Sequence, residues 1–168
     1  IAQPSQLLTA SATSGTIACN GGTTTVTVAA SGGTAPYLGT GTYTVSAGTY
    51  NYTVTDANGI TASTSVTVTQ PSLLSATASS GTITVTGGTT TVSVTAQGGT
   101  SPYSYKLDAG TYQSGSSFSG VSAGTHTITV KDANSCTKTI SITIAQPSQL
   151  LTASATSGTI ACNGGTTT

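Results

Sequence analysis

The chain is poor in charged residues. It has three Lys and three Asp but no Arg or Glu, so charged residues make up 4% of its 168 positions, against about 25% in ordinary soluble proteins. Nucleic-acid binding needs clustered Lys and Arg to neutralise phosphates, and docking on an anionic membrane needs a polybasic segment. No apolar run approaches the roughly 18 residues of a membrane-spanning helix. We therefore expect no nucleic-acid partner and no membrane insertion.

Side chains that carry chemistry are also scarce. The chain has a single His, and the nearest carboxylate to His126 in sequence, Asp132, lies beyond a full predicted strand. A nucleophile and base system would need a closer partner. Asp56 and Asp132 each begin an Asp-Ala-Asn segment, which is typical of a turn, and three Asp are too few for an ordinary Ca²⁺ site. The sequence predicts no catalytic residue, no metal site and no cofactor.

The first twenty-five residues return unchanged at positions 144–168, an offset of 143 residues. Such a repeat predicts that the chain is part of a tandem array. The frame Gln-Pro-Ser begins at Gln3, Gln70 and Gln146, so the repeating unit has two halves of 67 and 76 residues. We expect one module at 1–69, a second at 70–145, and the start of a third at 146–168.

The two halves share further short frames. Gly-Gly-Thr-x-Pro-Tyr occurs at 32–37 and 98–103, and Ala-Gly-Thr occurs at 47–49 and 123–125. Between these two frames the first half is ten residues shorter, which is the size of one strand plus a turn. The first half is therefore predicted to be a trimmed version of the second.

Apolar residues alternate with Thr and Ser in the predicted strands, at 24–28, 50–54, 126–130 and 140–144 among others. Gly and Pro interrupt these strands at intervals of about ten residues, which is typical of a β-sandwich. We expect an all-β chain of tandem immunoglobulin-like β-sandwich modules, with six or seven strands each, stacked end to end in a filament.

The segment from Gly98 to Cys136 contains the frames Gly-Gly-Thr-x-Pro-Tyr, Ala-Gly-Thr and Asp-Ala-Asn in this order. It resembles the SprB-type repeat of giant surface adhesins of gliding bacteria. The resemblance covers the second half well and the first half apart from its deletion. It implies a long, exported filament at the cell surface that serves adhesion and gliding motility. It implies no ligand-binding residue.

The three cysteines are unevenly placed. Cys19 corresponds to Val85 of the second half, and Cys136 corresponds to Ile60 of the first, whereas the SprB-type repeat has Cys at both places. On an assumed immunoglobulin-like topology the two places lie at opposite poles of one module, too far apart for a disulfide. In stacked modules, the lower pole of the first would meet the upper pole of the second.

We therefore prefer a Cys19–Cys136 disulfide across the module junction, with Cys162 paired to a Cys further along the array. The alternatives are Cys136–Cys162 and free buried thiols. A disulfide would indicate an oxidising, extracellular setting. At the other junction Val85 would face the next counterpart of Ile60.

Tyrosines are the main aromatic resource. In sandwiches Tyr mostly fills the edge of the core and ties its hydroxyl to the backbone, and stacking on sugars is the alternative. The candidates for surface contacts are Tyr37, Tyr43, Tyr103, Tyr105 and Tyr112.

The sequence favours a non-enzymatic structural and adhesive repeat of a very long extracellular filament at the cell surface. Its expected partners are neighbouring repeats, lateral copies of the filament, and surfaces or glycans. The alternatives are an array of glycan-binding modules and a subunit of an assembled pilus or sheath.

Overall fold

The computed structural model describes residues 6–148 and 153–156, and these residues form eleven β-strands and no helix. Their bounds are β1 Thr9–Ser14, β2 Thr24–Ser31, β3 Gly41–Val45, β4 Gly48–Thr55, β5 Thr61–Val68, β6 Ser75–Ser80, β7 Thr90–Gln97, β8 Ser104–Leu107, β9 Ser117–Val121, β10 Gly124–Lys131 and β11 Thr137–Ile144. The strands predicted from alternating Thr and apolar residues are confirmed in β2, β4, β10 and β11.

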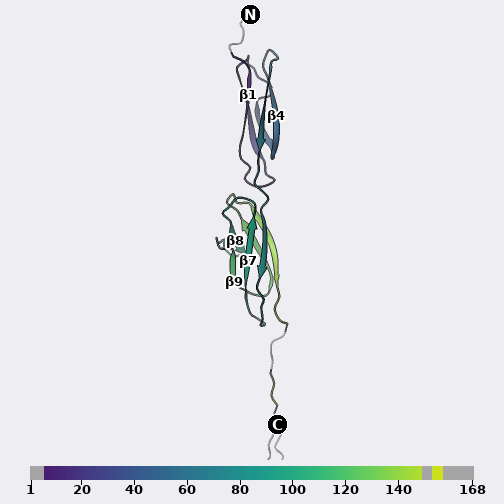
Figure 1. Ribbon diagram of the computed structural model, residues 1–168, viewed down its shortest axis with the longest axis vertical. Helices are drawn as coiled ribbons and strands as arrows, with labels where there is room; N and C mark the ends of the chain where they lie inside the picture. The colour runs from purple at the N-terminus through teal and green to yellow at the C-terminus, as the bar shows by residue number, and fades with distance from the viewer. Residues whose placement is uncertain (1–5, 149–152, 157–168) are drawn as a thin grey trace, which may run out of the picture.

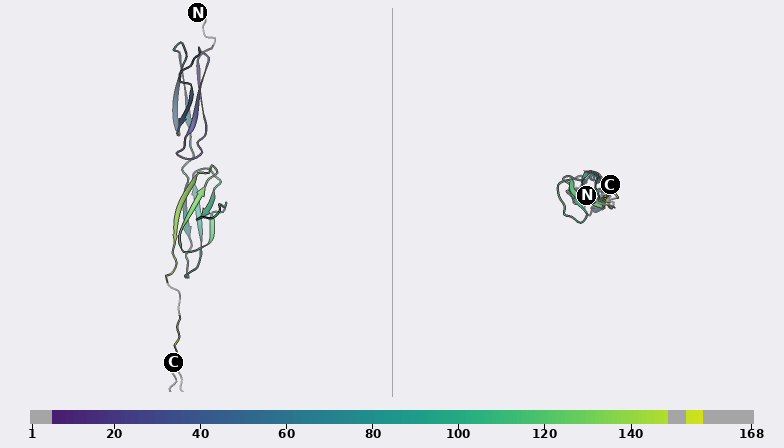
Figure 2. Two further views of the ribbon diagram at one scale, coloured as in Figure 1. Left: turned by 180° about the vertical axis from the view of Figure 1, so that it is seen from behind. Right: turned by 90° about the horizontal axis from the view of Figure 1, so that it is seen from below.

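The strands form two bodies that follow one another along the long axis of the molecule (Figure 1). We call β1–β5 the first module and β6–β11 the second module. Seen along the long axis, the two modules largely overlap, so the second continues the direction of the first (Figure 2).

Each module is a sandwich of two antiparallel sheets. The first module has the sheets β1-β2-β3 and β4-β5, and the second has β6-β7-β9 and β11-β10-β8. In the second module the first, second and fourth strands share one sheet, and the third, fifth and sixth share the other. This division matches the A-B-E and C-F-G sheets of an immunoglobulin-like sandwich.

Among the described residues the second module has six strands, within the six or seven expected, and the first has five, one fewer than expected. Strand D of an immunoglobulin-like sandwich is missing from the second module, because the residues between β8 and β9 form turns and one isolated bridge, Tyr105 to Gln113. This stretch is rich in Gly and Ser and lacks the alternating β-branched residues that favour a strand.

The ten-residue deletion in the first module corresponds to β8 and the turn after it. In the second module β8 pairs with β10 at four positions, from Ser104 to Leu107. In the first module a single bridge between Leu38 and Thr55 stands in this place. The second sheet of the first module is therefore reduced to two strands, in agreement with the prediction that this half is trimmed.

Each module encloses its own core. Val26 and Val54 in the first module and Val92, Ile128 and Val130 in the second are fully buried. The remaining buried apolar residues are Leu8, Ile17, Val28 and Val68 in the first core and Leu74, Ile83, Val94, Tyr105, Val121 and Ile144 in the second. The strand deletion thus leaves the first module with the smaller core.

Candidate functional site

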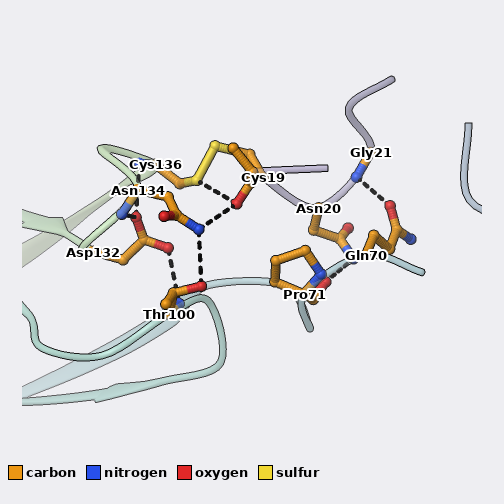
Figure 3. The surroundings of a disulfide bond; sticks show 10 residues. Cys19, Asn20, Gly21, Gln70, Pro71, Thr100, Asp132, Asn134 and Cys136 are labelled. Carbon is orange, nitrogen blue, oxygen red and sulfur yellow. Dashed lines mark hydrogen bonds between the residues drawn. A yellow bond between two sulfur atoms is a disulfide. The ribbon is translucent and has the colours of Figure 1, made fainter. Parts of the chain in front are cut away.

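The two modules are joined covalently. A disulfide connects Cys19, in the turn before β2, to Cys136, in the turn between β10 and β11 (Figure 3). The two Cα atoms are 5.7 Å apart, within the range that disulfides adopt. This is the pairing preferred from the sequence. Cys162 lies outside the described residues.

Asn134 adds a polar contact beside the disulfide. Its side-chain amide donates hydrogen bonds to the carbonyl oxygen of Ala18 in the first module and to the hydroxyl of Thr100 in its own module, each 3.0 Å long. The equivalent amide of Asn58 donates to Thr34 within the first module. The amide of Asn134 therefore ties its own turn to the preceding module as well as to the Gly-Gly-Thr loop.

The turn that presents Cys136 is fixed by a buried carboxylate. One oxygen of Asp132 accepts the backbone N–H groups of Asn134 and Cys136, at 2.9 and 2.8 Å, and the other accepts the N–H of Thr100 at 2.9 Å. Asp132 is 3% exposed. The turn-forming role predicted for this residue is confirmed, and its burial and its tie to the Gly-Gly-Thr loop are additional findings.

Asp56 builds the same turn in the first module. Its carboxylate accepts the backbone N–H groups of Thr34, Asn58 and Ile60. Burial raises the pKa of Asp56, but the three backbone hydrogen bonds outweigh burial and hold the pKa below its ordinary value. Gly33 lies against this carboxylate with a φ of 59°, and a Cβ there would come within 2.8 Å of it. The paired occurrence of the Gly-Gly-Thr and Asp-Ala-Asn frames in both halves is the signal of this contact in the sequence.

The connection between the modules is held by hydrogen bonds from the Gln-Pro-Ser frame. The backbone N–H of Gly21 donates to the side-chain oxygen of Gln70 at 2.7 Å, and the amide of Asn20 donates to the carbonyl of Pro71 at 2.9 Å (Figure 3). We call these contacts, together with the disulfide and the Asn134 contact, the first joint.

The Gln-Pro contacts recur at the lower end of the second module. The backbone N–H of Gly87 donates to the side-chain oxygen of Gln146 at 2.9 Å, and the hydroxyl of Thr86 donates to the carbonyl of Pro147 at 3.0 Å. We call this the second joint. Val85 stands where the first module has Cys19, and this residue is 64% exposed. The second joint therefore repeats the contacts to Gln and Pro of the first joint, with the Thr86 hydroxyl in place of the Asn20 amide and Val85 in place of Cys19.

Three of the five tyrosines predicted as surface contacts are committed to the fold. The hydroxyls of Tyr37 and Tyr103 each donate a 2.7 Å hydrogen bond to a Gly carbonyl five residues earlier. Tyr105 is buried in the second core. These residues support the core edge, as Tyr commonly does in sandwiches.

Tyr43 and Tyr112 are more open, with exposed fractions of 36% and 37%. Tyr43 lies on β3 of the first module against Tyr52, with ring centroids 4.9 Å apart. Tyr112 lies in the second module beneath two lysine side chains, Lys131 and Lys106, whose Nζ atoms are 4.3 and 5.4 Å from its ring centroid. The two rings belong to different modules, and their role in surface contacts stays a prediction.

His126 has the carboxylate partner that the sequence did not indicate. Its Nδ1 lies 2.8 Å from Oδ2 of Asp108, whose other oxygen accepts the N–H of Thr127, and its Nε2 lies 3.1 Å from the carbonyl of Ser122. Asp108 is 18 residues away in sequence, and a left-handed backbone conformation with a φ of 48° places it in the turn after β8. The expectation that His126 lacks a nearby acid is thus corrected.

The geometry of this pair favours a charged imidazole, because both ring nitrogens face acceptors. The hydrogen bond to Asp108 raises the pKa of His126. In turn, the hydrogen bonds from His126 and Thr127 lower the pKa of Asp108. The nitrogen that a general base would use is occupied by a backbone carbonyl, so the pair serves to hold the turn after β8 against β10.

Among residues 6–148 and 153–156, no three His, Cys, Asp or Glu side chains gather in a way that could hold a metal ion. The same residues include no helix long and apolar enough to cross a membrane.

No protein-family model matches the chain, and no curated protein sequence matches it. Among solved structures, it is similar to the three N-terminal domains of the highly immunogenic outer capsid protein (Hoc) of bacteriophage RB49. The identity is 15%, the match covers 83% of this chain and 58% of that one, and the TM-score is 0.44. It is also similar to a C-terminal fragment of intimin, solved with the intimin-binding domain of the translocated intimin receptor. Here the identity is 15%, the coverage is 85% and 64%, and the TM-score is 0.43. The chain spans less than two thirds of either structure, and both superpositions are too loose to carry an inference about function.

Proposed function

We propose that this chain is a structural and adhesive repeat of a very long extracellular filament at the cell surface, of the SprB type, and that it serves attachment and gliding motility. Its work in this proposal is mechanical: the modules hold a contact surface away from the cell. We place the module boundaries at Gln70 and Gln146, where each Gln-Pro-Ser frame begins.

The observation that carries the proposal is the repetition of the joint. Gln146 and Pro147 bond to the lower pole of the second module as Gln70 and Pro71 bond to the lower pole of the first. Because residues 144–168 repeat residues 1–25, the contacts that place the second module under the first are available to place a further module under the second. This supports end-to-end stacking along an array.

The extracellular location is supported by the disulfide, since disulfides persist in oxidising compartments. A non-enzymatic role is supported by the way the reactive groups are used. Asp56 and Asp132 accept backbone hydrogen bonds in turns, and both nitrogens of His126 are engaged.

We further propose that disulfide-linked and apolar joints alternate along the array. Val85 at the lower pole of the second module is 64% exposed, and Ile60 in the β4–β5 turn of the first is 53% exposed. In an array the second joint would bring Val85 against the next counterpart of Ile60. In a chain of two 143-residue units, Val85→Asp should widen the range of angles between the units, which changes the small-angle scattering profile. An unchanged profile would contradict the apolar contact.

The test of the proposed function is the mass of the native chain under denaturing conditions, with and without reductant. A single covalent array predicts a mass of many hundreds of kDa and no change on reduction, since 168 residues account for only 16.2 kDa. Collapse to small subunits would contradict the array and favour an assembled pilus or sheath. Retention of neutral and acidic polysaccharides by the chain would separate a spacer from an array of glycan-binding modules.

A further inference from the structure

The charges of the chain are unevenly satisfied. Two of its three Asp, Asp56 and Asp132, are buried and accept backbone hydrogen bonds, and the third, Asp108, pairs with His126. In the part of the chain that the structure describes, His126–Asp108 is the one ion pair. The lysines therefore have no carboxylate partner within that part.

Two of the three lysines converge on one aromatic ring. Lys131 lies on β10 and Lys106 on β8, and their Nζ atoms are 4.3 and 5.4 Å from the centroid of Tyr112. Lys106 is directly opposite Thr129, and strand alternation places Thr129 and Lys131 on the same face. Both lysines thus lie on the outer face of the sheet, while the inner face carries the buried Tyr105 and Val130.

The segment that carries Tyr112 is held in place. The backbone of Gln113 exchanges two hydrogen bonds with Tyr105, at 2.8 and 2.9 Å. The side-chain amide of Gln113 donates to the carbonyls of Gly115 and Ser117, each at 2.9 Å. The ring is therefore positioned against the two ammonium groups before any ligand arrives, while 37% of the residue stays open to solvent.

We propose that Lys106, Lys131 and Tyr112 form a binding site for an acidic saccharide, meaning a sugar ring that carries a carboxylate or a sulfate group. The anionic group would supply the missing counter-charge for the two ammonium groups. The apolar face of the sugar would pack on the open part of the Tyr112 ring. This inference rests on the proposed surface role and names the class of ligand.

The site occurs once in each 143-residue unit. The first module lacks β8 and the segment that carries Tyr112, and it has Thr55 at the position of Lys131. An exposed pair of charges binds weakly and is screened by salt. Attachment would therefore come from many sites along an array acting together.

The experiment couples the 168-residue chain densely to beads and measures retention of three polymers at low ionic strength: alginate with carboxylates, heparin with sulfates, and neutral dextran. The proposal predicts that at least one acidic polymer is retained well above dextran. K131Q should reduce that retention about threefold and K106Q/K131Q about tenfold, since multivalent retention amplifies a small loss per site. Comparing alginate with heparin identifies which acidic group is preferred.

K138Q is the matched control, because it removes the same single charge as K131Q from a lysine that does not contact Tyr112. It should leave retention unchanged. The proposal is overturned if neither acidic polymer exceeds dextran, if K138Q loses as much as K131Q, or if K106Q/K131Q retains as much as the unmodified chain. Thermal unfolding of each variant checks that the second module is intact. Loss of the saccharide site would not change the mass of the native array under denaturing conditions. The binding site and the proposed function can therefore be contradicted independently.

Discussion

The two modules share a framework and differ in what they carry. Both have the Asp turn, the Tyr hydroxyl bonded to a Gly carbonyl, and a Gln-Pro contact at the lower pole. The first module contains one charged residue, Asp56, whereas the second contains all three Lys, two Asp and the single His. The shared residues build the sandwich and the joint, and the residues particular to the second module add charge on and around β8 and β10.

The presence or absence of β8 accounts for much of this difference. With β8 the second module gains a third strand in its second sheet and the turn that brings Asp108 to His126. Without it the first module keeps two strands there and leaves Leu38 76% exposed. We therefore expect the first module to be the less stable of the two and to depend more on the joint.

The largest expected effect comes from removing the disulfide with the residues that the sister positions already hold, in the double variant Cys19→Val/Cys136→Ile. The disulfide closes a loop of 117 residues, and in the chain-entropy model such a loop contributes roughly 4–5 kcal/mol against unfolding of both modules. We expect one cooperative thermal transition to separate into two, with the first module unfolding at lower temperature. Calorimetry measures this.

The control for this variant is the unmodified chain with reductant, which should behave alike. A single transition at an unchanged temperature in both samples would show that the disulfide does not couple the modules.

A second prediction compares the two cores at equivalent positions. Val54 and Val130 are both fully buried at the same place on β4 and β10, and truncation to Ala should cost each module about 2 kcal/mol. Because the first module has the smaller core, Val54→Ala should unfold it separately from the second, while Val130→Ala should leave the second module folded at room temperature. Hydrogen exchange of the β4 and β10 amides measures the two stabilities, and a more stable first module would contradict the comparison.

The smallest effect concerns the pH dependence of the second module. The raised pKa of His126 means that its stabilising contribution is complete below the ordinary His value of about 6.5 and is lost as pH rises through the higher folded value. The lowered pKa of Asp108 means that its contribution is present above the ordinary Asp value and is lost as pH falls through the lower folded value.

The pair therefore stabilises the second module most between the ordinary pKa values of Asp and His, 3.8 and 6.5, and the stabilisation is lost as pH moves beyond them through the folded values. Asp108 is 48% exposed at its side chain, so the loss above neutral pH should stay below about 1 kcal/mol. His126→Tyr restores the residue of the first module, where the hydroxyl of Tyr50 bonds to the carbonyl of Ser46. Chemical denaturation from pH 6 to 9 should show the decline in the unmodified chain and none in the variant. Equal slopes would contradict the assignment.

The sequence predicted the strands because alternating Thr and Val residues define a buried and an exposed face. It also led to the Cys19–Cys136 pairing. Each half has only one of the two cysteines, and stacking brings the pole that carries Cys19 against the pole that carries Cys136. The Gln-Pro-Ser frame indicated the boundary between modules but not that the Gln70 side chain accepts a backbone hydrogen bond from the preceding module.

Two features could not be predicted because they depend on the turns after β8. Asp108 reaches His126 through a left-handed backbone conformation that no local pattern required. Tyr112 meets Lys106 and Lys131 only because the following Gln113 pairs with Tyr105 and strand D is absent. Both contacts join residues of different strands and turns, where alternation carries no information.

We expect the disulfide and hydrogen bonds of the first joint to hold the two modules in one fixed relative orientation. Residual dipolar couplings of backbone amides in the oxidised chain test it most directly. We expect couplings from β1–β5 and β6–β11 to fit a single alignment tensor with the relative orientation seen in Figure 1. Two tensors of different magnitude would show that the modules move independently and would contradict the claim.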